Sequence, residues 1–285
     1  MRILVTGVKG QLGYDVCREL EKRGFSDVRG IDREELDITD ECAVQKYIKE
    51  YVPQAVIHCA AYTAVDRAET ERELCRGVNA LGTKYLAEAS AKCGAKFLYI
   101  STDYVFDGEK NGEYNPSDVR NPRSVYGATK AEGEDFVKKS TDKFFIVRIS
   151  WVFGINGNNF VKTMLRLAET KKELNVVCDQ IGSPTYTADL AKLLVDMIQT
   201  ERYGVYHATC EGFCSWYEFA CEIFRLSGKQ VRVNPVTTKE YCAMVAQQAV
   251  RPMNSRMDKS ELEKRGFSRL PEWKNALEKY IKEIL

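Results

Sequence analysis

The sequence predicts an α/β protein in which a doubly wound parallel sheet is followed by a smaller C-terminal lobe. Over the first 150 residues, short apolar runs typical of buried strands alternate with segments of helical periodicity. A glycine-rich turn follows the first of these runs, and after Trp151 the regular alternation gives way to turn-rich segments. The chain has 285 residues, which is long enough for one large domain with an additional lobe.

The chain is almost neutral, with 42 Lys and Arg residues against 41 Asp and Glu residues. Because it has no block of like charge, neither a nucleic acid nor a membrane surface is an expected partner. Its apolar runs fall well short of the ~20 residues that span a bilayer. The N-terminus reaches Gly7 after three apolar residues, too few for the core of a signal peptide. The sequence therefore predicts a cytoplasmic protein.

Ten cysteines and two histidines are present, but their pattern does not favour a metal centre. No Cys-x-x-Cys pair occurs, and Cys210 with Cys214 has no matching second pair of ligands. His58 and His207 each lie in an apolar, strand-like run, where we expect a structural role. Without a secretion signal, the cysteines are expected to be reduced.

The first strand, residues 3–5, leads into a glycine turn and a helix that ends near Gly24. This order is the context of a dinucleotide-binding fingerprint, here with the spacing Gly-x-x-Gly-x-x-Gly. Gly7 would allow the tight turn, Gly10 the approach of the backbone to a pyrophosphate, and Gly13 close packing of the helix. Free N–H groups at the helix N-terminus would bind the phosphates. The pattern predicts a Rossmann-type cofactor site.

The second strand, residues 28–31, ends in Asp32, about twenty residues after the glycines. A carboxylate at this place suits the ribose 2′-hydroxyl of NADH, whereas an adjacent arginine can accept the 2′-phosphate of NADPH. Asp32 is followed directly by Arg33, so the residues leave both cofactors open. A helix capped by Thr39 or Asp40 is expected next.

Small residues end the third strand, residues 55–61. Ala60 and Ala61, followed by Tyr62, would let a cofactor lie against the backbone, although tight strand packing explains small residues equally well. A helix is expected over residues 74–93, where Gly94 stops it.

The fourth strand, residues 97–100, runs into Ser101, Thr102 and Asp103. Polar residues at the carboxyl end of a strand are where open α/β sheets bind their ligands. Residues 107–123 are rich in Gly, Asn, Pro and Asp, and predict a surface loop long enough to cover a substrate.

Tyr126 and Lys130 lie four residues apart on a predicted helix, so both side chains should point to one face. The pKa of a free phenol is about 10. A fixed ammonium one turn away favours the phenolate, and is expected to lower the pKa of Tyr126 toward the range of a general acid. An ordinary helix surface is the alternative interpretation. The position of the pair, after Thr102 and a ligand-covering loop, favours proton delivery to a carbonyl group.

Beyond Trp151 a helix is expected from about residue 158, then a turn-rich connector over 180–185 and a helix over 188–199. This helix and the following strand, which contains Val205, are expected to return to the main sheet. Further helices should begin at Ser215 and after Trp273. We therefore expect a dinucleotide-binding domain over 1–150, joined by about 183–210, and a substrate-binding lobe over most of 151–285.

Taken together, these motifs resemble the extended short-chain dehydrogenases/reductases, and within them the dTDP-4-dehydrorhamnose reductase family. The glycine pattern and the Tyr-x-x-x-Lys pair carry the wider resemblance. The narrower one covers nearly the whole chain and rests on these segments, in the family's order: 10–13, 60–69, 101–106, 125–130, 150–153, 158–166, 179–185 and 251–255.

The resemblance implies NAD(P)H-dependent reduction of the C4 keto group of a dTDP-bound 6-deoxyhexose, with NADPH expected and NADH as an alternative. Tyr126 would deliver the proton, Lys130 would hold the nicotinamide ribose, and Thr102 would hydrogen-bond the keto oxygen. Asp103 and Trp151 fall where the family contacts the sugar, and Arg251 is a candidate partner for the diphosphate. The expected cofactor contacts are Gly7, Gly10, Gln11, Leu12, Gly13, Asp32, Arg33, Asp37, Ile38, Ala60, Ala61, Tyr62, Ile100, Tyr126 and Lys130.

The chain departs from the family pattern in two places. Some members bind magnesium at a dimer contact through glutamates; here Asp15 stands at one such position and Ala188 at another, so no metal requirement is expected. Val250 stands where members often carry a second basic residue, which weakens the expected phosphate contact. Either a monomer or a homodimer fits these features.

Two alternatives remain from the sequence. The first is a reductase, epimerase or dehydratase acting on another nucleotide sugar; the related dehydratases carry an Asp-Glu pair, whereas Asp103 is followed by Tyr104. The second is a non-enzymatic subunit resembling the regulatory subunit of methionine adenosyltransferase. The retained Tyr126, Lys130 and Thr102 favour an enzyme.

Overall fold

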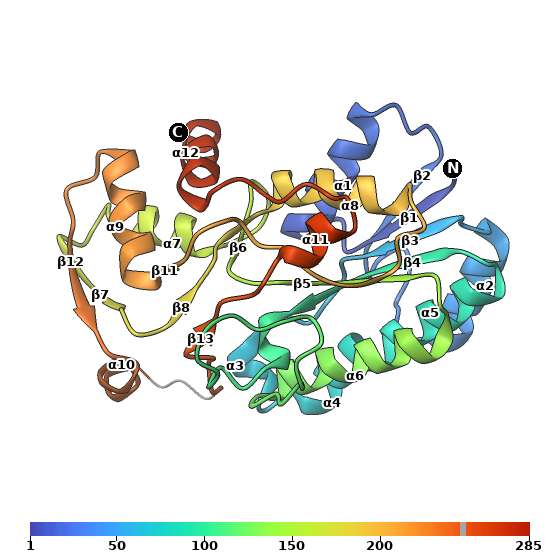
Figure 1. The fold of residues 1–285 in the computed structure, drawn as a ribbon, viewed down its shortest axis with the longest axis horizontal. Helices are drawn as coiled ribbons and strands as arrows, with labels where there is room; N and C mark the ends of the chain where they lie inside the picture. The colour runs from blue at the N-terminus through green and yellow to red at the C-terminus, as the bar shows by residue number, and fades with distance from the viewer. Residues whose placement is uncertain (246–248) are drawn as a thin grey trace.

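The computed structural model describes residues 1–245 and 249–285. A six-stranded parallel sheet forms its centre, with the strand order β10-β5-β4-β3-β1-β2 (Figure 1). The order reverses between β1 and β3, which creates the crevice where open α/β sheets bind ligands. The strands are β1 (Ile3–Thr6), β2 (Val28–Ile31), β3 (Ala55–His58), β4 (Lys96–Thr102), β5 (Phe144–Ile149) and β10 (Gly204–His207).

Helices cover both faces of this sheet, because neighbouring strand residues point to opposite sides. Ile3 and Val5 face the core beneath α1 (Gln11–Lys22) and α8 (Thr187–Ile198), whereas Leu4 faces the core beneath the other helices. That second layer consists of α2 (Glu41–Tyr51), α5 (Thr83–Lys92) and α6 (Val125–Ser140). Figure 1 shows the two helical layers on opposite sides of the strands. The predicted α/β class with a doubly wound parallel sheet is confirmed.

The helix expected over residues 74–93 is continuous but not uniform. It comprises α4 (Arg72–Arg76), a π-helical segment (Gly77–Gly82) and α5, and it follows the short α3 (Val65–Ala68). Gly94 ends it at φ +69°, in the left-handed region that glycine adopts without strain. The π-helical segment passes close to the cofactor side of the sheet, since a Cβ on Gly82 would lie 2.9 Å from Ile38 Cγ1.

In the described residues, the C-terminal lobe holds three small sheets. β6 (Val152–Phe153) pairs with β9 (Thr185–Tyr186), and β7 (Glu173–Val177) pairs with β12 (Arg232–Val236). β8 (Ile181–Gly182) lies between β11 (Cys214–Ser215) and β13 (Asn254–Ser255). The lobe's helices are α7 (Phe160–Leu167), α9 (Trp216–Ser227), α10 (Thr238–Met244), α11 (Ser260–Lys264) and α12 (Trp273–Ile284). In Figure 1, α7, α9, β7 and β12 lie at the far end of the molecule from α2.

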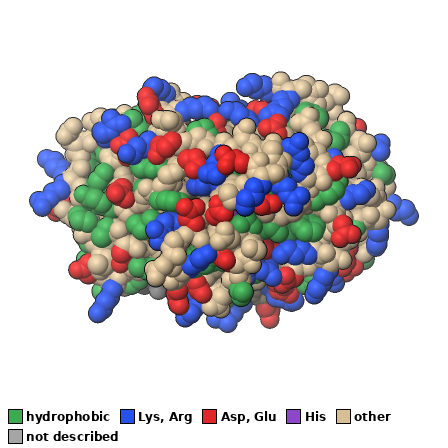
Figure 2. Space-filling model, in the orientation of Figure 1, with side chains coloured by type: hydrophobic (Ala, Val, Ile, Leu, Met, Phe, Trp, Pro, Cys, Tyr) green, Lys and Arg blue, Asp and Glu red, His purple; other side chains and the backbone are tan. Residues whose placement is uncertain are grey.

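Local capping explains where several of these helices begin. The Ser215 and Glu218 side chains form a capping box at α9, and the Asn159 side chain accepts a hydrogen bond from Lys162 N at α7. The segment expected to return to the main sheet supplies α8 and the edge strand β10. Positive and negative side chains are interspersed over the face in Figure 2, in keeping with the near-neutral composition. No helix in the described part of the chain is long and apolar enough to cross a membrane.

Candidate active site

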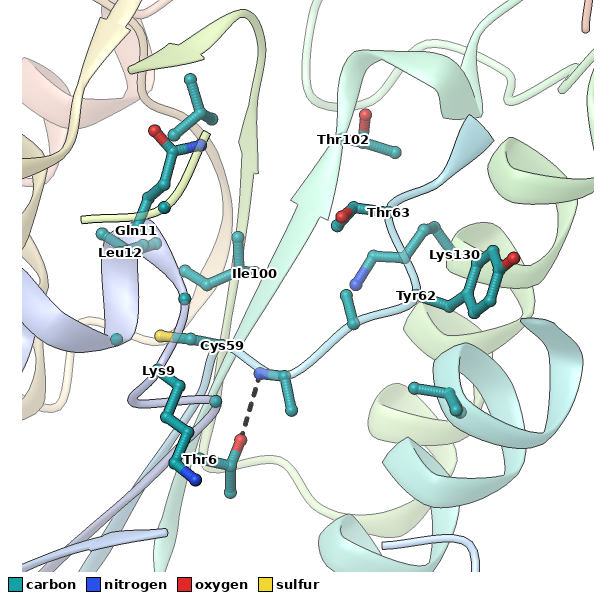
Figure 3. A pocket seen from close by; sticks show the side chains of 18 of the residues that line it. Thr6, Lys9, Gln11, Leu12, Cys59, Tyr62, Thr63, Ile100, Thr102 and Lys130 are labelled. Atoms are coloured by element: carbon teal, nitrogen blue, oxygen red, sulfur yellow. Dashed lines mark hydrogen bonds between the residues drawn. The ribbon is translucent and has the colours of Figure 1, made fainter. Parts of the chain in front are cut away.

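A cavity of about 780 Å³ lies at the carboxyl ends of the sheet strands. Figure 3 shows Lys9, Gln11 and Leu12 on one side of it and Tyr62 and Lys130 on the other. All the expected site residues except Arg251 line this cavity: Gly7, Gly10, Gln11, Leu12, Gly13, Asp32, Arg33, Asp37, Ile38, Ala60, Ala61, Tyr62, Ile100, Thr102, Asp103, Tyr126, Lys130 and Trp151.

The glycine turn is built so that three backbones meet with no side chain between them. Gly7 has φ +72°, and a Cβ there would lie 2.7 Å from the backbone of Ala60. A Cβ on Gly13 would lie 2.3 Å from the carbonyl oxygen of Gly7. Gly10 is the N-cap of α1 and gives it no side-chain cap, so the first-turn N–H groups face the cavity and suit a pyrophosphate.

Thr6 fixes the end of β3 beside this turn. Its hydroxyl accepts a hydrogen bond from Ala60 N at 3.2 Å, drawn as the dashed line in Figure 3. It is also 2.7 Å from Nδ1 of the buried His58, whose pKa burial lowers to about 3. His58 is therefore neutral, and its role is structural. Sequence reasoning missed Thr6 as a lining residue, although it directly precedes Gly7.

Carboxylates and cations lie at the end of the cavity that is next to the carboxyl end of β2. The Asp32 carboxylate accepts hydrogen bonds from the backbone N–H groups of Lys9 (3.0 Å) and Arg33 (2.8 Å). The Lys9 ammonium pairs with Glu34 at 2.6 Å, and Arg33 lies 3.7 Å from Asp37. An acceptor for a ribose hydroxyl and two cations for a phosphate thus lie together. Lys9 was not predicted, although its place between Gly7 and Gly10 is the signal that could have found it.

Lys130 is buried in the wall of the cavity, with only 2% of its surface exposed. Its ammonium lies 4.1 Å from the ring centroid of Tyr99, which stabilises the cation. Burial nevertheless lowers the pKa of Lys130 to about 7, with the charge of Glu134 acting in the opposite direction. The lysine therefore changes its charge near neutral pH.

Tyr126 lies one turn before Lys130 and packs edge-on against Tyr104, with ring centroids 5.4 Å apart. Ser124 caps their helix by accepting a hydrogen bond from Gly127 N at 3.1 Å. The expectation that Lys130 lowers the pKa of Tyr126 is wrong for this geometry. Burial raises the pKa of Tyr126 well above its usual value, and the largest opposing effect is a hydrogen bond with Thr102. Tyr126 thus stays protonated over a wide pH range and is available as a donor.

Thr102 and Asp103 form a buried polar pair next to Tyr126. Thr102 Oγ1 donates to Asp103 Oδ1 at 2.9 Å, and Ser255 Oγ donates to Asp103 Oδ2 at 2.5 Å. Burial raises the pKa of Asp103 to about 6, despite these hydrogen bonds. Because a hydroxyl has a single proton, Thr102 can donate to a substrate oxygen only by releasing Asp103.

Trp151 forms the wall on the side of the C-terminal lobe. It adopts φ +50°, an uncommon conformation for a residue with a bulky side chain. Its ring stacks on Trp216 at a centroid distance of 3.7 Å, and a Cβ on Gly182 would lie 2.9 Å from it. The indole is thus held in one orientation by Trp216 and by the backbone of Gly182.

Arg251 does not line the cavity in this structure. Its guanidinium donates to Asp66 Oδ2 at 2.7 Å and to the Tyr104 hydroxyl at 3.0 Å. The Asp66 carboxylate also accepts a hydrogen bond from Ala249 N at 3.1 Å, so it holds the chain on the N-terminal side of Arg251. Arg251 thus contacts Tyr104, which lines the cavity, but its charge is already paired with Asp66.

Asp15, one of the positions considered for a metal, is buried and engaged by protein groups. Its carboxylate accepts from the Thr187 hydroxyl at 2.5 Å and lies 3.5 Å from Arg18. Burial raises the pKa of Asp15. Within residues 1–245 and 249–285, no cluster of three or more His, Cys, Asp or Glu side chains could hold a metal ion.

Known proteins resemble this chain over nearly its whole length. The family model of the RmlD substrate binding domain matches residues 1–285. A dTDP-4-dehydrorhamnose reductase of Aggregatibacter actinomycetemcomitans is 42% identical over 97% of this chain and 97% of its own length.

Two crystal structures of proteins with that same name are also similar. The Clostridium acetobutylicum protein has a TM-score of 0.96 and 46% identity, covering 100% of this chain and 99% of its own. The Bacillus anthracis protein, solved in complex with NADP, has a TM-score of 0.95 and 45% identity, covering 99% of both chains.

Proposed function

The chain belongs to the dTDP-4-dehydrorhamnose reductase family, and from this premise we propose that it reduces the C4 keto group of dTDP-4-dehydro-L-rhamnose to give dTDP-L-rhamnose. The resemblance predicted from the sequence motifs is thereby confirmed. The observation that carries the proposal is the meeting of Tyr126, Thr102 and Lys130 in the cavity that also contains the glycine turn.

The cofactor-binding half of the cavity fits NADPH. The glycine turn and the uncapped N-terminus of α1 would bind the pyrophosphate. The Bacillus anthracis relative was solved in complex with NADP, which supports this choice of cofactor. Lys9 and Arg33 would hold a 2′-phosphate, and Asp32 can accept from a ribose hydroxyl when NADH takes its place. When bound, the reduced nicotinamide supplies the hydride.

Tyr126 would donate its proton to the oxygen at C4 as the hydride adds to that carbon. A raised pKa suits this task, because an alkoxide is a much stronger base than a phenolate and the phenol must stay protonated until the alkoxide develops. Thr102 would donate to the same oxygen, and the Lys130 ammonium would hold the nicotinamide ribose. The phenolate left on Tyr126 then recovers a proton from solvent.

The C-terminal lobe would hold the nucleotide sugar, with the cofactor on residues 1–150. Trp151 gives a flat apolar wall and Asp103 a carboxylate, which suit the two faces of a deoxyhexose. For Arg251 to bind the diphosphate, as we expect, it must exchange Asp66 for the substrate. This exchange keeps the guanidinium paired with an anion in both states.

The direct test follows NADPH oxidation by absorbance when dTDP-4-dehydro-L-rhamnose is added to the protein. Substrate-dependent oxidation with formation of dTDP-L-rhamnose supports the proposal. A parallel panel with other dTDP-4-keto sugars, each with NADPH and NADH, identifies the preferred pair. Folded protein that binds NADPH but oxidises it with none of these sugars would refute the assignment.

A further inference from the structure

A fully buried carboxylate lies one helical turn beyond Lys130. Glu134 is 0% exposed and accepts hydrogen bonds from Ser101 Oγ at 2.6 Å and from Arg148 Nε at 2.8 Å. Arg148 Nη2 donates to its second oxygen at 2.7 Å, and the Arg148 side chain is 1% exposed. The pair is therefore bidentate and shielded from water.

This ion pair joins elements that carry the reacting groups. Glu134 is on α6 with Tyr126 and Lys130, whereas Ser101 directly precedes Thr102 at the end of β4. Arg148 lies on β5, the next strand of the sheet. The Glu134 carboxylate thus links the helix that carries Tyr126 to the end of the strand that carries Thr102.

The same network reaches the loop expected to cover the substrate. Arg148 Nη1 donates to the carbonyl oxygen of Pro116 at 3.0 Å, and Arg120 Nη1 lies 3.3 Å from Glu134 Oε2. Arg120 also donates to the carbonyl oxygen of Ala131 at 2.7 Å. These contacts therefore fix the loop against the helix through a single cluster of side chains.

We propose that Glu134 is a positioning residue of the reaction: it fastens the catalytic helix to the strand end of Thr102 and, one helical turn from Lys130, favours the ammonium form of that side chain. The proposal rests on the proposed function, because it gives Lys130 the task of holding the cofactor. Glu134 is buried and does not line the cavity, so it acts through Lys130 and Ser101.

The electrostatic part of the proposal follows from the surroundings of Lys130. Burial lowers the pKa of Lys130 to about 7, and the charge of Glu134 is the largest effect that raises it. The titratable groups around Lys130 are Glu134, Tyr126, Cys59, Cys75, Tyr99 and His58; those around Glu134 are Arg148, Arg120, Lys138, Tyr99 and His207. Glu134 is the one carboxylate among the groups named around Lys130 in residues 1–245 and 249–285, and Arg148 holds it ionised by keeping its pKa low.

A purely structural salt bridge would behave differently. Removing one partner of a buried ion pair destabilises the fold strongly, because the other charge is left uncompensated. Its replacement would then change the folding stability but leave the pH at which Lys130 titrates unchanged. The pH dependence of cofactor binding separates the two roles.

The test measures the NADPH dissociation constant by fluorescence from pH 5.5 to 9 for the wild-type protein and Glu134→Gln. Affinity is expected to fall as pH rises through the pKa of Lys130, because the neutral amine holds the ribose less well. In Glu134→Gln this fall should begin at a pH lower by about one unit, at the small end of the effect of a neighbouring charge. The control is Glu132→Gln, on the same helix, whose partner is the exposed Arg76 at 2.6 Å; its profile should match the wild type.

Glu134→Gln leaves the Arg148 guanidinium buried without its partner, so the double variant Glu134→Gln/Arg148→Gln is measured as well. It removes both charges and should also shift the midpoint downward, by less than the single variant, because loss of the Arg148 cation removes a repulsion on Lys130. A midpoint equal to that of the wild type in whichever of these variants folds would overturn the proposal. NADPH binding needs no sugar, so a failure of the proposed reduction appears in the turnover assay alone and is distinguishable from this outcome.

Discussion

Replacing Asp103 by asparagine is predicted to change the stability and the activity of the protein in opposite directions. The Asp103 carboxylate is 3% exposed, and burial raises its pKa from 3.8 to about 6. The difference is about two pKa units, and each unit corresponds to about 1.4 kcal/mol. Ionised Asp103 thus costs the folded protein about 3 kcal/mol relative to an unperturbed carboxylate.

The sign of the pH dependence follows from the two protonation states. Below pH 3.8 the carboxyl is protonated in the folded and in the unfolded chain, so it has no effect on stability. Between 3.8 and about 6 only the unfolded chain releases the proton, and stability falls as pH rises; above about 6 the loss is constant. Asp103→Asn removes this term. The Ser255 hydroxyl can turn to accept from the new amide, so the hydrogen bonds are largely kept.

We expect Asp103→Asn to gain about 3 kcal/mol of unfolding free energy over the wild type between pH 4 and 7, while losing turnover on the sugar. Urea unfolding followed by tryptophan fluorescence at several pH values measures the gain. A cost of the substitution that does not depend on pH cancels when the stability difference between the two proteins is plotted against pH. Asp107→Asn is the control for this window: a hydrogen bond from Tyr114 lowers the pKa of Asp107, so its effect on stability changes only below pH 3.8 and its difference from the wild type should stay nearly flat from pH 4 to 7. A difference between wild type and Asp103→Asn that stays flat from pH 4 to 7 would contradict the reasoning.

Three further predictions concern the cavity. Tyr126→Phe keeps the ring against Tyr104 but loses the proton donor, so kcat should fall by about 10²–10⁴-fold with NADPH affinity unchanged; near-normal turnover would assign the acid to another group. Gly13→Ala places a Cβ 2.3 Å from Gly7 O and should abolish NADPH binding, and a titration showing wild-type affinity would disprove this account of the turn. Gly182→Ala brings a Cβ within 2.9 Å of the Trp151 ring and should raise KM for the sugar alone; an equal change in KM for NADPH would count against a sugar-specific wall.

Local patterns in the sequence predict much of the fold and of the cofactor site. The glycine spacing, the acidic residue after β2 and the Tyr-x-x-x-Lys pair each act over a few residues, so they can be read without the fold. Strand β4 extends to Thr102, two residues beyond its predicted end, because its polar end residues pair with β5.

The remaining features depend on contacts between distant segments. Arg251 meets Asp66 across 185 positions, and Glu134 looks like an ordinary helix residue until Arg148 is placed beside it. The left-handed backbone of Trp151 has no signal in its residue type, and the Trp216 ring on which it stacks comes from a distant segment. The pKa of Tyr126 was predicted in the wrong direction because the spacing to Lys130 does not reveal burial.

The return of α8 and β10 to the main sheet has a consequence for how the chain is made. Val16 and Leu20 of α1 are fully buried in the same core as Leu190 of α8, and Phe145 of β5 shares that core with Tyr206 of β10. A nascent chain that has emerged only to residue 150 therefore carries every glycine of the cofactor turn but exposes the part of one apolar sheet face that α8 covers in the complete fold. The ribosome must release about sixty more residues before that face is covered, so the cofactor half matures only after much of the second lobe has been synthesised.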